Sequence, residues 1–223
     1  HMKRSLQIFF TIIVLAAMIF SLAGRWDWWP GWGFFLIVIG ATSVESYILY
    51  RHDPELIMAR ARFGKGTRPS DYVFLAVFGL AFLGVLVVGP LDAARFAWAP
   101  LPAWSFALGA ALYLFGEALV GWSMYENTFF EKTVRLQTDR GHHVITTGPY
   151  AFVRHPGYVA FSIGYGLGFP LMLGSAWAFV PSAVAVIAVV VRTASEDRFL
   201  TENLTGYADY RRETRYRLLP GVW

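Results

Sequence analysis

Residues 157–191 read GYVAFSIGYGLGFPLMLGSAWAFVPSAVAVIAVVV and contain no charged side chain. This run of 35 residues is too long for one membrane crossing, which takes roughly 20 apolar residues in a helix. Pro170, Gly174 and Pro181 lie near its middle, and proline and glycine interrupt helices. The stretch therefore predicts a tight helical hairpin that crosses a membrane twice and returns to the side from which it started.

Four more apolar stretches precede the hairpin, at residues 5–24, 28–44, 72–91 and 96–116. The 223-residue chain is 56% hydrophobic and only 15% charged, whereas soluble domains carry about 25% charged residues. The first stretch is longer than the core of a signal peptide, so we expect it to be a span. The sequence thus predicts an all-α integral membrane protein with about six transmembrane helices, including a C-terminal helical hairpin.

The basic residues predict the orientation of these helices. With six alternating helices, all of the 19 Lys and Arg residues except Arg25 and Arg95 fall on one face, including Arg62 and Lys65 of the 45–71 loop. Cytoplasmic loops carry the excess of positive charge. We therefore expect a multi-pass protein of the plasma (inner) membrane with both termini and the active site cytoplasmic, and we expect no nucleic-acid partner despite the net charge of +4. A five-span arrangement would put a basic segment outside and is disfavoured.

Two polar stretches flank the hairpin, at residues 126–156 and 192–217. Because the hairpin returns to the same face, His155 and Arg192 are predicted to be neighbours in space. Gly148-Pro149 and His155-Pro156 are turn signals, and a helix is expected to begin at Pro156. These turns would hold Tyr150, Arg154, His155 and Tyr158 at the membrane surface, either as a site or as an interfacial loop that contacts lipid headgroups.

Arg192 and Glu196 lie at positions i and i+4 of the helix that leaves the hairpin. They form either a helix-end ion pair or part of a site, since ionisable residues at membrane depth usually line one. Residues 199–216 carry apolar and aromatic side chains between charged ones. They predict an amphipathic C-terminal tail that forms a helix and lies on the inner leaflet or covers the site as a lid.

Together these motifs resemble the isoprenylcysteine carboxyl methyltransferase family and the wider group of membrane phospholipid methyltransferases. The resemblance covers roughly residues 125–221. Its motifs are Gly148-Pro149-Tyr150-x-x-x-Arg154-His155-Pro156-x-Tyr158, then Arg192-x-x-x-Glu196-Asp197, then Gly206-Tyr207-x-x-Tyr210, and Arg217-Leu218-Leu219-Pro220. The order and spacing of these motifs make the resemblance specific. Residues 1–125 match in hydropathy and in Asp53-Pro54-Glu55-Leu56, so we divide the chain into four N-terminal spans (1–125) and a methyltransferase core (126–223).

The resemblance implies transfer of a methyl group from S-adenosylmethionine to a lipophilic acceptor, most simply a carboxylate such as that of an isoprenylcysteine. It implies that Arg192 and Glu196 are catalytic, that Arg192 orients the acceptor carboxylate and that Glu196 holds the polar end of the cofactor. The implied cofactor contacts are Gln137, His142, His143, Val144, Ile145, Tyr150, His155, Pro156, Gly157, Tyr158 and Glu196.

Two other activities remain open on the same residues: methylation of a phospholipid or other amine, and a reduction of the sterol-reductase type with NADPH. Gly164-x-Gly166-x-Gly168 superficially resembles a dinucleotide fingerprint, but it lies in an uncharged helix, so we assign it to close helix packing. The chain has no cysteine, and no carboxylate lies at ligand spacing from His142, His143 or His155, so no metal site is predicted. Glu45 and Glu117, near helix ends, are either buried polar partners or site residues.

Overall fold

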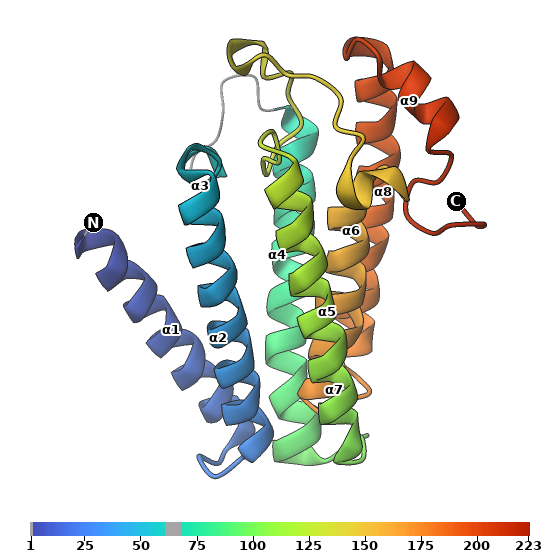
Figure 1. Cartoon of the computed structure of the whole chain (residues 1–223). Coiled ribbons are helices and arrows are strands. Elements are labelled where there is room, and N and C mark those ends of the chain that lie inside the picture. Colours follow the sequence, from blue (N-terminus) through green and yellow to red (C-terminus); the bar gives the residue numbers. More distant parts are fainter. Residues whose placement is uncertain (1, 61–67) are drawn as a thin grey trace.

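The computed structural model describes residues 2–60 and 68–223, and over these residues the chain forms helices and loops without a strand. The elements stand side by side as a bundle of long helices (Figure 1). Arg62 and Lys65 of the predicted basic loop lie outside the described residues. The α-helices are α1 (Met2–Ala23), α2 (Trp29–His52), α3 (Pro54–Arg60), α4 (Pro69–Pro90), α5 (Trp104–Glu126), α6 (Pro156–Phe161), α7 (Phe169–Met172), α8 (Phe179–Asn203) and α9 (Tyr207–Glu213). Two π-helical segments, η1 (Leu91–Phe96) and η4 (Ser162–Gly168), and two 3-10 turns, η2 (Thr138–Arg140) and η3 (Gly148–Ala151), complete them.

Four helices are long and apolar enough to cross a membrane: α2, α4 with its continuation η1, α5 and α8. Helix α1 has a shorter apolar part, Phe10–Ala23. The first arm of the hairpin is divided into α6, η4 and α7. An all-helical chain with several helices long and apolar enough to span a membrane is thus confirmed, whereas the total of six spans stays a prediction.

The hairpin reverses at residues 173–178, between α7 and α8. Gly174 adopts a left-handed conformation there, with φ of 68°, which suits glycine because it has no Cβ. Buried Asp92 anchors the turn by accepting hydrogen bonds from the Ser175 hydroxyl at 2.6 Å and from the Trp177 amide at 3.2 Å. The reversal therefore lies between Pro170 and Pro181, as the sequence indicates.

Helix α5 begins later than predicted, at Trp104 instead of residue 96. Ala97 has a φ of 49°, and Pro100 and Pro102 follow it. Proline has no amide hydrogen and disfavours helix in the residue before it, so residues 97–103 form a connection instead of the first turns of a span.

Glycines allow α5 to lie directly against the first arm of the hairpin. A Cβ on Gly116 would meet the Cα of Gly164 at 2.7 Å, and one on Gly109 would meet the Gly168 carbonyl at 2.7 Å. The three nearest atoms at Gly116 are main-chain atoms, and those at Gly109 are two main-chain atoms and the Leu171 Cβ, so no side chain can rotate out of the way. This close approach confirms the packing role predicted for Gly164 and Gly168.

Replacing Gly116 with alanine is expected to lower the free energy of unfolding by about 1–3 kcal/mol, because the new methyl group overpacks a main-chain contact. Gly79 of α4 is a matched control, since a Cβ there meets nothing within 4 Å. Thermal unfolding of the detergent-solubilised variants measures the effect. Equal stability of G116A and G79A would contradict the assigned packing.

Candidate active site

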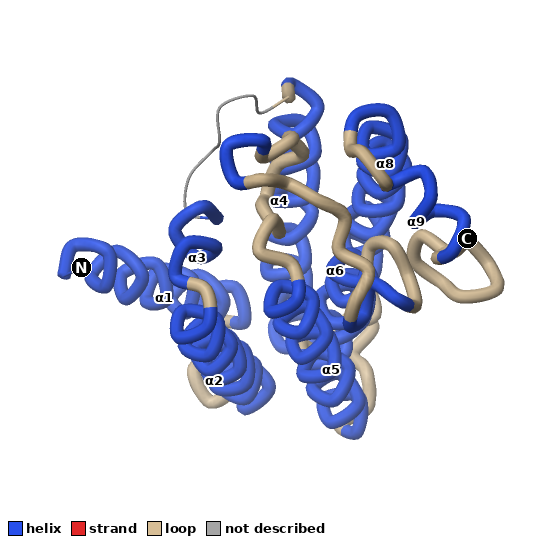
Figure 2. Tube along the Cα trace, turned by 45° about the horizontal axis from the view of Figure 1, so that its top comes forward, coloured by secondary structure: helices blue, strands red, loops and turns tan. Residues whose placement is uncertain are grey.

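A cavity of about 210 Å³ lies where the 127–156 loop meets α8 and α9. Figures 1 and 2 show these segments, far apart in the sequence, at the same end of the bundle as α3. Every residue predicted to contact the cofactor lines this cavity, from Gln137 and His142 through Tyr158 to Glu196. The predicted juxtaposition of the two polar stretches is therefore confirmed.

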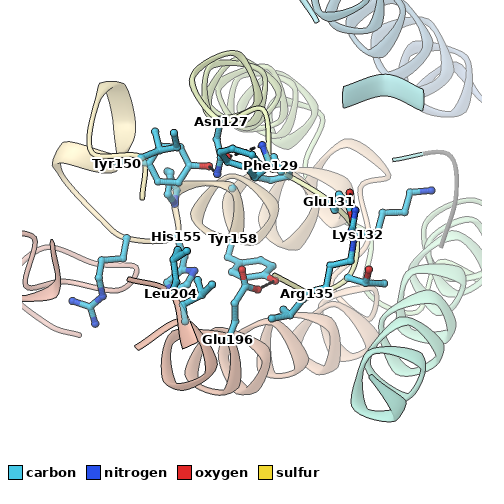
Figure 3. Close-up of a pocket in the computed structure, with 18 of the residues that line it drawn as sticks. Asn127, Phe129, Glu131, Lys132, Arg135, Tyr150, His155, Tyr158, Glu196 and Leu204 are labelled. Atoms are coloured by element: carbon cyan, nitrogen blue, oxygen red, sulfur yellow. Dashed lines mark hydrogen bonds and ion pairs between the residues drawn. The ribbon is translucent and has the colours of Figure 1, made fainter. Parts of the chain in front are cut away.

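Tyr158 and Glu196 meet at the centre of the cavity (Figure 3). The Tyr158 hydroxyl donates to Glu196 Oε2 at 2.5 Å, and Arg192 Nε donates to the Tyr158 hydroxyl at 3.3 Å. Arg192 Nε also lies 3.8 Å from Glu196 Oε2, which confirms the predicted i,i+4 proximity. Tyr158 comes from α6 and Glu196 from α8, so the two arms of the hairpin place one hydrogen-bonded carboxylate on the cavity wall.

Arg192 is held away from the cavity by an ion pair that the sequence did not indicate. Its guanidinium bonds to Asp71 at the start of α4, and both side chains are at least 95% buried. Asp71 also accepts from the Val134 amide at 3.0 Å. Among the described residues that line the cavity, neither Arg192 nor Asp71 is found, so Arg192 contacts the site through Tyr158 and Glu196.

Asp197, next to Glu196, joins three segments of the chain and is only 1% exposed. Its carboxylate accepts from Arg154 Nε at 2.7 Å, from Arg217 Nε at 2.9 Å and from the Tyr207 hydroxyl at 3.0 Å. His155 Nε2 lies 3.3 Å from the same carboxylate. This cluster fixes the motif loop and the tail against α8 and thereby shapes the cavity.

The tail is not the single amphipathic helix that the sequence predicts. Helix α8 continues to Asn203, and Gly206, with φ of 85°, turns the chain into the short helix α9. Leu204, Tyr207 and Tyr210 then line the cavity, so the alternative in which the tail covers the site is confirmed. Burial and the charge of Asp197 raise the pKa of Tyr207, and its hydroxyl therefore stays protonated as a donor.

The loop that precedes the motif forms the opposite wall. Gln137 is 1% exposed, and its side chain donates to the Phe129 carbonyl at 2.7 Å. Burial lowers the pKa of His142, and His142 Nδ1 accepts from the Gln137 amide at 3.3 Å, as a neutral imidazole does. The Phe129 ring packs against His142 and His143, with centroids 4.6 and 5.1 Å apart. Around Phe129, Gln137 and His142, this wall presents aromatic and neutral polar surface.

The site also contains residues that the sequence analysis did not assign. They come from α3, α4 and the start of the 127–156 loop: Arg60, Phe74, Leu75, Phe78, Asn127, Phe129, Phe130, Glu131, Lys132, Thr133, Val134 and Arg135. Asp53-Pro54 was a usable signal for α3, because aspartate caps helices and proline favours their first turn. Asp53 accepts from the Leu56 amide at 2.9 Å and from the Thr128 hydroxyl at 2.6 Å, which ties α3 to the loop.

The cavity suits an extended ligand with a cationic end, an aromatic part and an apolar neighbour. The Glu196 carboxylate provides negative charge, Phe129 and its histidine neighbours provide aromatic faces, and Phe78 and Phe161 provide apolar surface. Gly157 lets the Phe130 ring lie close, since a Cβ on Gly157 would meet that ring at 2.5 Å. Within the described ranges, no group of three His, Asp or Glu side chains has the arrangement of a metal site.

Comparison with known families agrees with the motifs. Residues 109–202 match the family model of the isoprenylcysteine carboxyl methyltransferase (ICMT) family. The matched range contains α6, the hairpin turn and nearly all of α8. The family resemblance that the motifs indicate is thus confirmed, and the match supports a membrane methyltransferase of the isoprenylcysteine type. A search of curated proteins gave no match.

Proposed function

We propose, from the match to the ICMT family, that this chain transfers a methyl group from S-adenosylmethionine to a lipophilic acceptor, with a carboxylate of the isoprenylcysteine type as the expected acceptor. The observation that carries the proposal is the Tyr158–Glu196 pair on a cavity that all the predicted cofactor residues line. The resident chemistry is simple: bound S-adenosylmethionine supplies a methyl group on a sulfonium, which is a good leaving group.

The donor's ammonium is assigned to Glu196, since a carboxylate favours a cation in a partly dry cavity. Its aromatic part is assigned to the wall of Phe129 and His142, where stacking and neutral hydrogen-bonding groups are available. His155 and Pro156 begin α6 beside this wall. The described residues therefore match the donor: the carboxylate faces its cationic end, and the aromatic wall faces its aromatic part.

The acceptor's chain is assigned to the apolar side of the cavity. Phe78, Phe161 and Val189 line the cavity and also line a narrow apolar cleft of about 10 Å³ between α4, η4 and α8. The side chains of this cleft would have to move apart to admit a hydrocarbon chain. A hydrocarbon chain buried there gains roughly 0.8 kcal/mol per CH₂ group. This end of the bundle is assigned to the cytoplasmic face by the distribution of basic residues, and the lipid tail would enter from the bilayer.

A carboxylate acceptor is already ionised at neutral pH, so the protein needs to position it and exclude water more than to remove a proton. Tyr158 and Arg192 share a hydrogen bond, and Arg192 adds positive charge directly behind the Tyr158–Glu196 pair. We assign to Arg192 the orientation of the acceptor carboxylate. Its guanidinium pairs with Asp71 and does not line the cavity, so it would have to turn toward the cavity when the acceptor binds, and Asp71 limits the strength of that ion pair.

The direct test is the transfer of a radiolabelled methyl group from S-adenosylmethionine by the purified protein. Label that enters a farnesylated cysteine analogue as a base-labile ester supports the proposal. Base-stable label in aminophospholipids would show that the acceptor is an amine instead of a carboxylate. Binding of NADPH, with neither label transfer nor S-adenosylhomocysteine binding, would overturn the proposal in favour of a reductase.

Replacing Arg192 with lysine is expected to lower methyl transfer by about tenfold and to raise KM for the acceptor, because lysine lacks the planar fork that a carboxylate prefers. Asp71→Asn should change KM in the opposite direction, since it releases the guanidinium from the partner that competes with the acceptor carboxylate. Calorimetric binding of S-adenosylhomocysteine should change by less than about threefold. If donor binding falls as much as turnover, Arg192 acts on the donor side instead.

A further inference from the structure

Two glutamates lie inside the membrane-spanning part of the chain, away from the cavity described above. Glu45 is on α2 and Glu117 on α5, about 10 and 13 Å below the ends of their helices at 1.5 Å per residue. Both side chains line one groove between these helices, and the Glu45 carboxyl packs over Gly121, one turn after Glu117. An ionisable residue at this depth carries a large cost unless it has a function or a partner.

Both carboxyls keep an oxygen without a hydrogen-bond partner among the described residues. Glu117 is 5% exposed, and Oε1 accepts from the Tyr165 hydroxyl at 2.6 Å, whereas Oε2 has no partner. Glu45 Oε1 is likewise unpaired. The cation that interacts with Glu45 is Arg60, but its guanidinium donates to the Phe130 carbonyl at 3.1 Å and lies over the Phe130 ring.

The two glutamates line a groove of about 640 Å³ between α2 and α5, and their unpaired oxygens are buried in its wall. Leu36, Val44 and Ile48 line it and are more than half exposed, so the groove is open to the lipid side. Among the described residues that line it there is no Lys, Arg or His, and it shares no lining residue with the candidate active site. A phosphate or carboxylate headgroup would find no cation here, and the two glutamates would repel it.

We propose that this groove binds a single-chain aliphatic amine, with its ammonium between Glu45 and Glu117 and its hydrocarbon chain along the apolar groove. An ammonium supplies the donors that the free carboxylate oxygens lack and relieves their mutual repulsion. The occupant differs in charge from the carboxylate acceptor, so this site is independent of the proposed methyl transfer.

The test uses purified protein in maltoside micelles and the quenching of Trp122, which lines the groove, by 11-bromoundecylamine. The W122F variant identifies the share of quenching that belongs to this residue. The alcohol and the carboxylic acid of the same chain length are the comparison probes. At neutral pH we expect the amine to bind about tenfold tighter than the alcohol, with the acid weakest.

Glu117→Gln and Glu45→Gln should each remove that preference, whereas Glu55→Gln, which changes an exposed acid of α3, should keep it. Gly40→Leu keeps both acids but fills the groove, because nothing lies within 4 Å of a Cβ at Gly40; it should abolish binding of all three probes. Gly79→Leu, equally open on α4, is the control for an added leucine.

Equal affinity for the amine and the alcohol would overturn the proposal and would leave the two carboxyls sharing a proton or neutralised by Arg60. Amine selectivity that survives in Glu117→Gln would also overturn it. Because quenching measures binding without methyl transfer, a protein that is inactive as a methyltransferase can still give the expected result. Equally, an active methyltransferase can fail to bind the amine.

Discussion

Replacing Asp197 with asparagine is expected to lower the free energy of unfolding by about 3–5 kcal/mol, the cost of breaking a buried ion pair on one side. The substitution leaves Arg154 and Arg217 without their carboxylate, and Arg154 is 95% buried. The midpoint of thermal unfolding, measured by intrinsic tryptophan fluorescence, should fall by about 6–20 °C for a chain of this length.

Asp209→Asn is the matched control for this experiment. Asp209 pairs with Arg212 at 3.0 Å, but both side chains are at least 74% exposed, and such surface pairs contribute about 0–1 kcal/mol. If D197N and D209N unfold at the same temperature, Asp197 does not join the motif loop and the tail to α8 as the structure describes.

Replacing Glu196 with glutamine is expected to weaken S-adenosylhomocysteine binding by about 10- to 100-fold, the value of a hydrogen bond to a charged group. The change keeps the size of the side chain and an acceptor for Tyr158 but removes the negative charge assigned to the ligand's ammonium. Methyl transfer should fall at least as much, because donor binding precedes it.

Methylthioadenosine, which lacks the amino-acid end, makes this prediction specific. Its affinity should be nearly the same in wild type and E196Q, so the variant loses the preference for S-adenosylhomocysteine. Glu202→Gln changes an exposed carboxylate on the same helix and should alter neither affinity. An equal loss of affinity for both ligands would contradict the assignment of Glu196 to the ammonium.

Local pattern was sufficient for much of the site. The turn at His155-Pro156, the i,i+4 relation of Arg192 and Glu196 and the return of the hairpin all depend on short-range geometry, and each is present in the structure. Because both arms end on one face, the cofactor residues from Gln137 to Glu196 meet on one cavity. The acceptor and the donor identities themselves remain proposals that the experiments above test.

Long-range partners were beyond the reach of the sequence. Asp71 stands 121 positions before Arg192, and no periodicity relates them; only the packing of α4 against α8 brings them together. The tail was predicted as one helix because its apolar spacing continues past Asn203, but Gly206 and the contacts of Tyr207 divide it.

The amino-acid sequence by itself determined that this chain is an all-helical membrane protein with a charge-free hairpin and two polar stretches that meet beside it. Lipid excludes charged side chains, and the helical period sets which residues share a face. Both constraints act on residues close together in the sequence, so the sequence alone reveals them. The tertiary structure alone decided which charges pair, so that Arg192 faces Asp71 while Glu117 keeps a free oxygen at the α2–α5 groove. The pairing of buried charges depends on how helices pack in three dimensions, and the sequence pattern does not distinguish one possible pair from another.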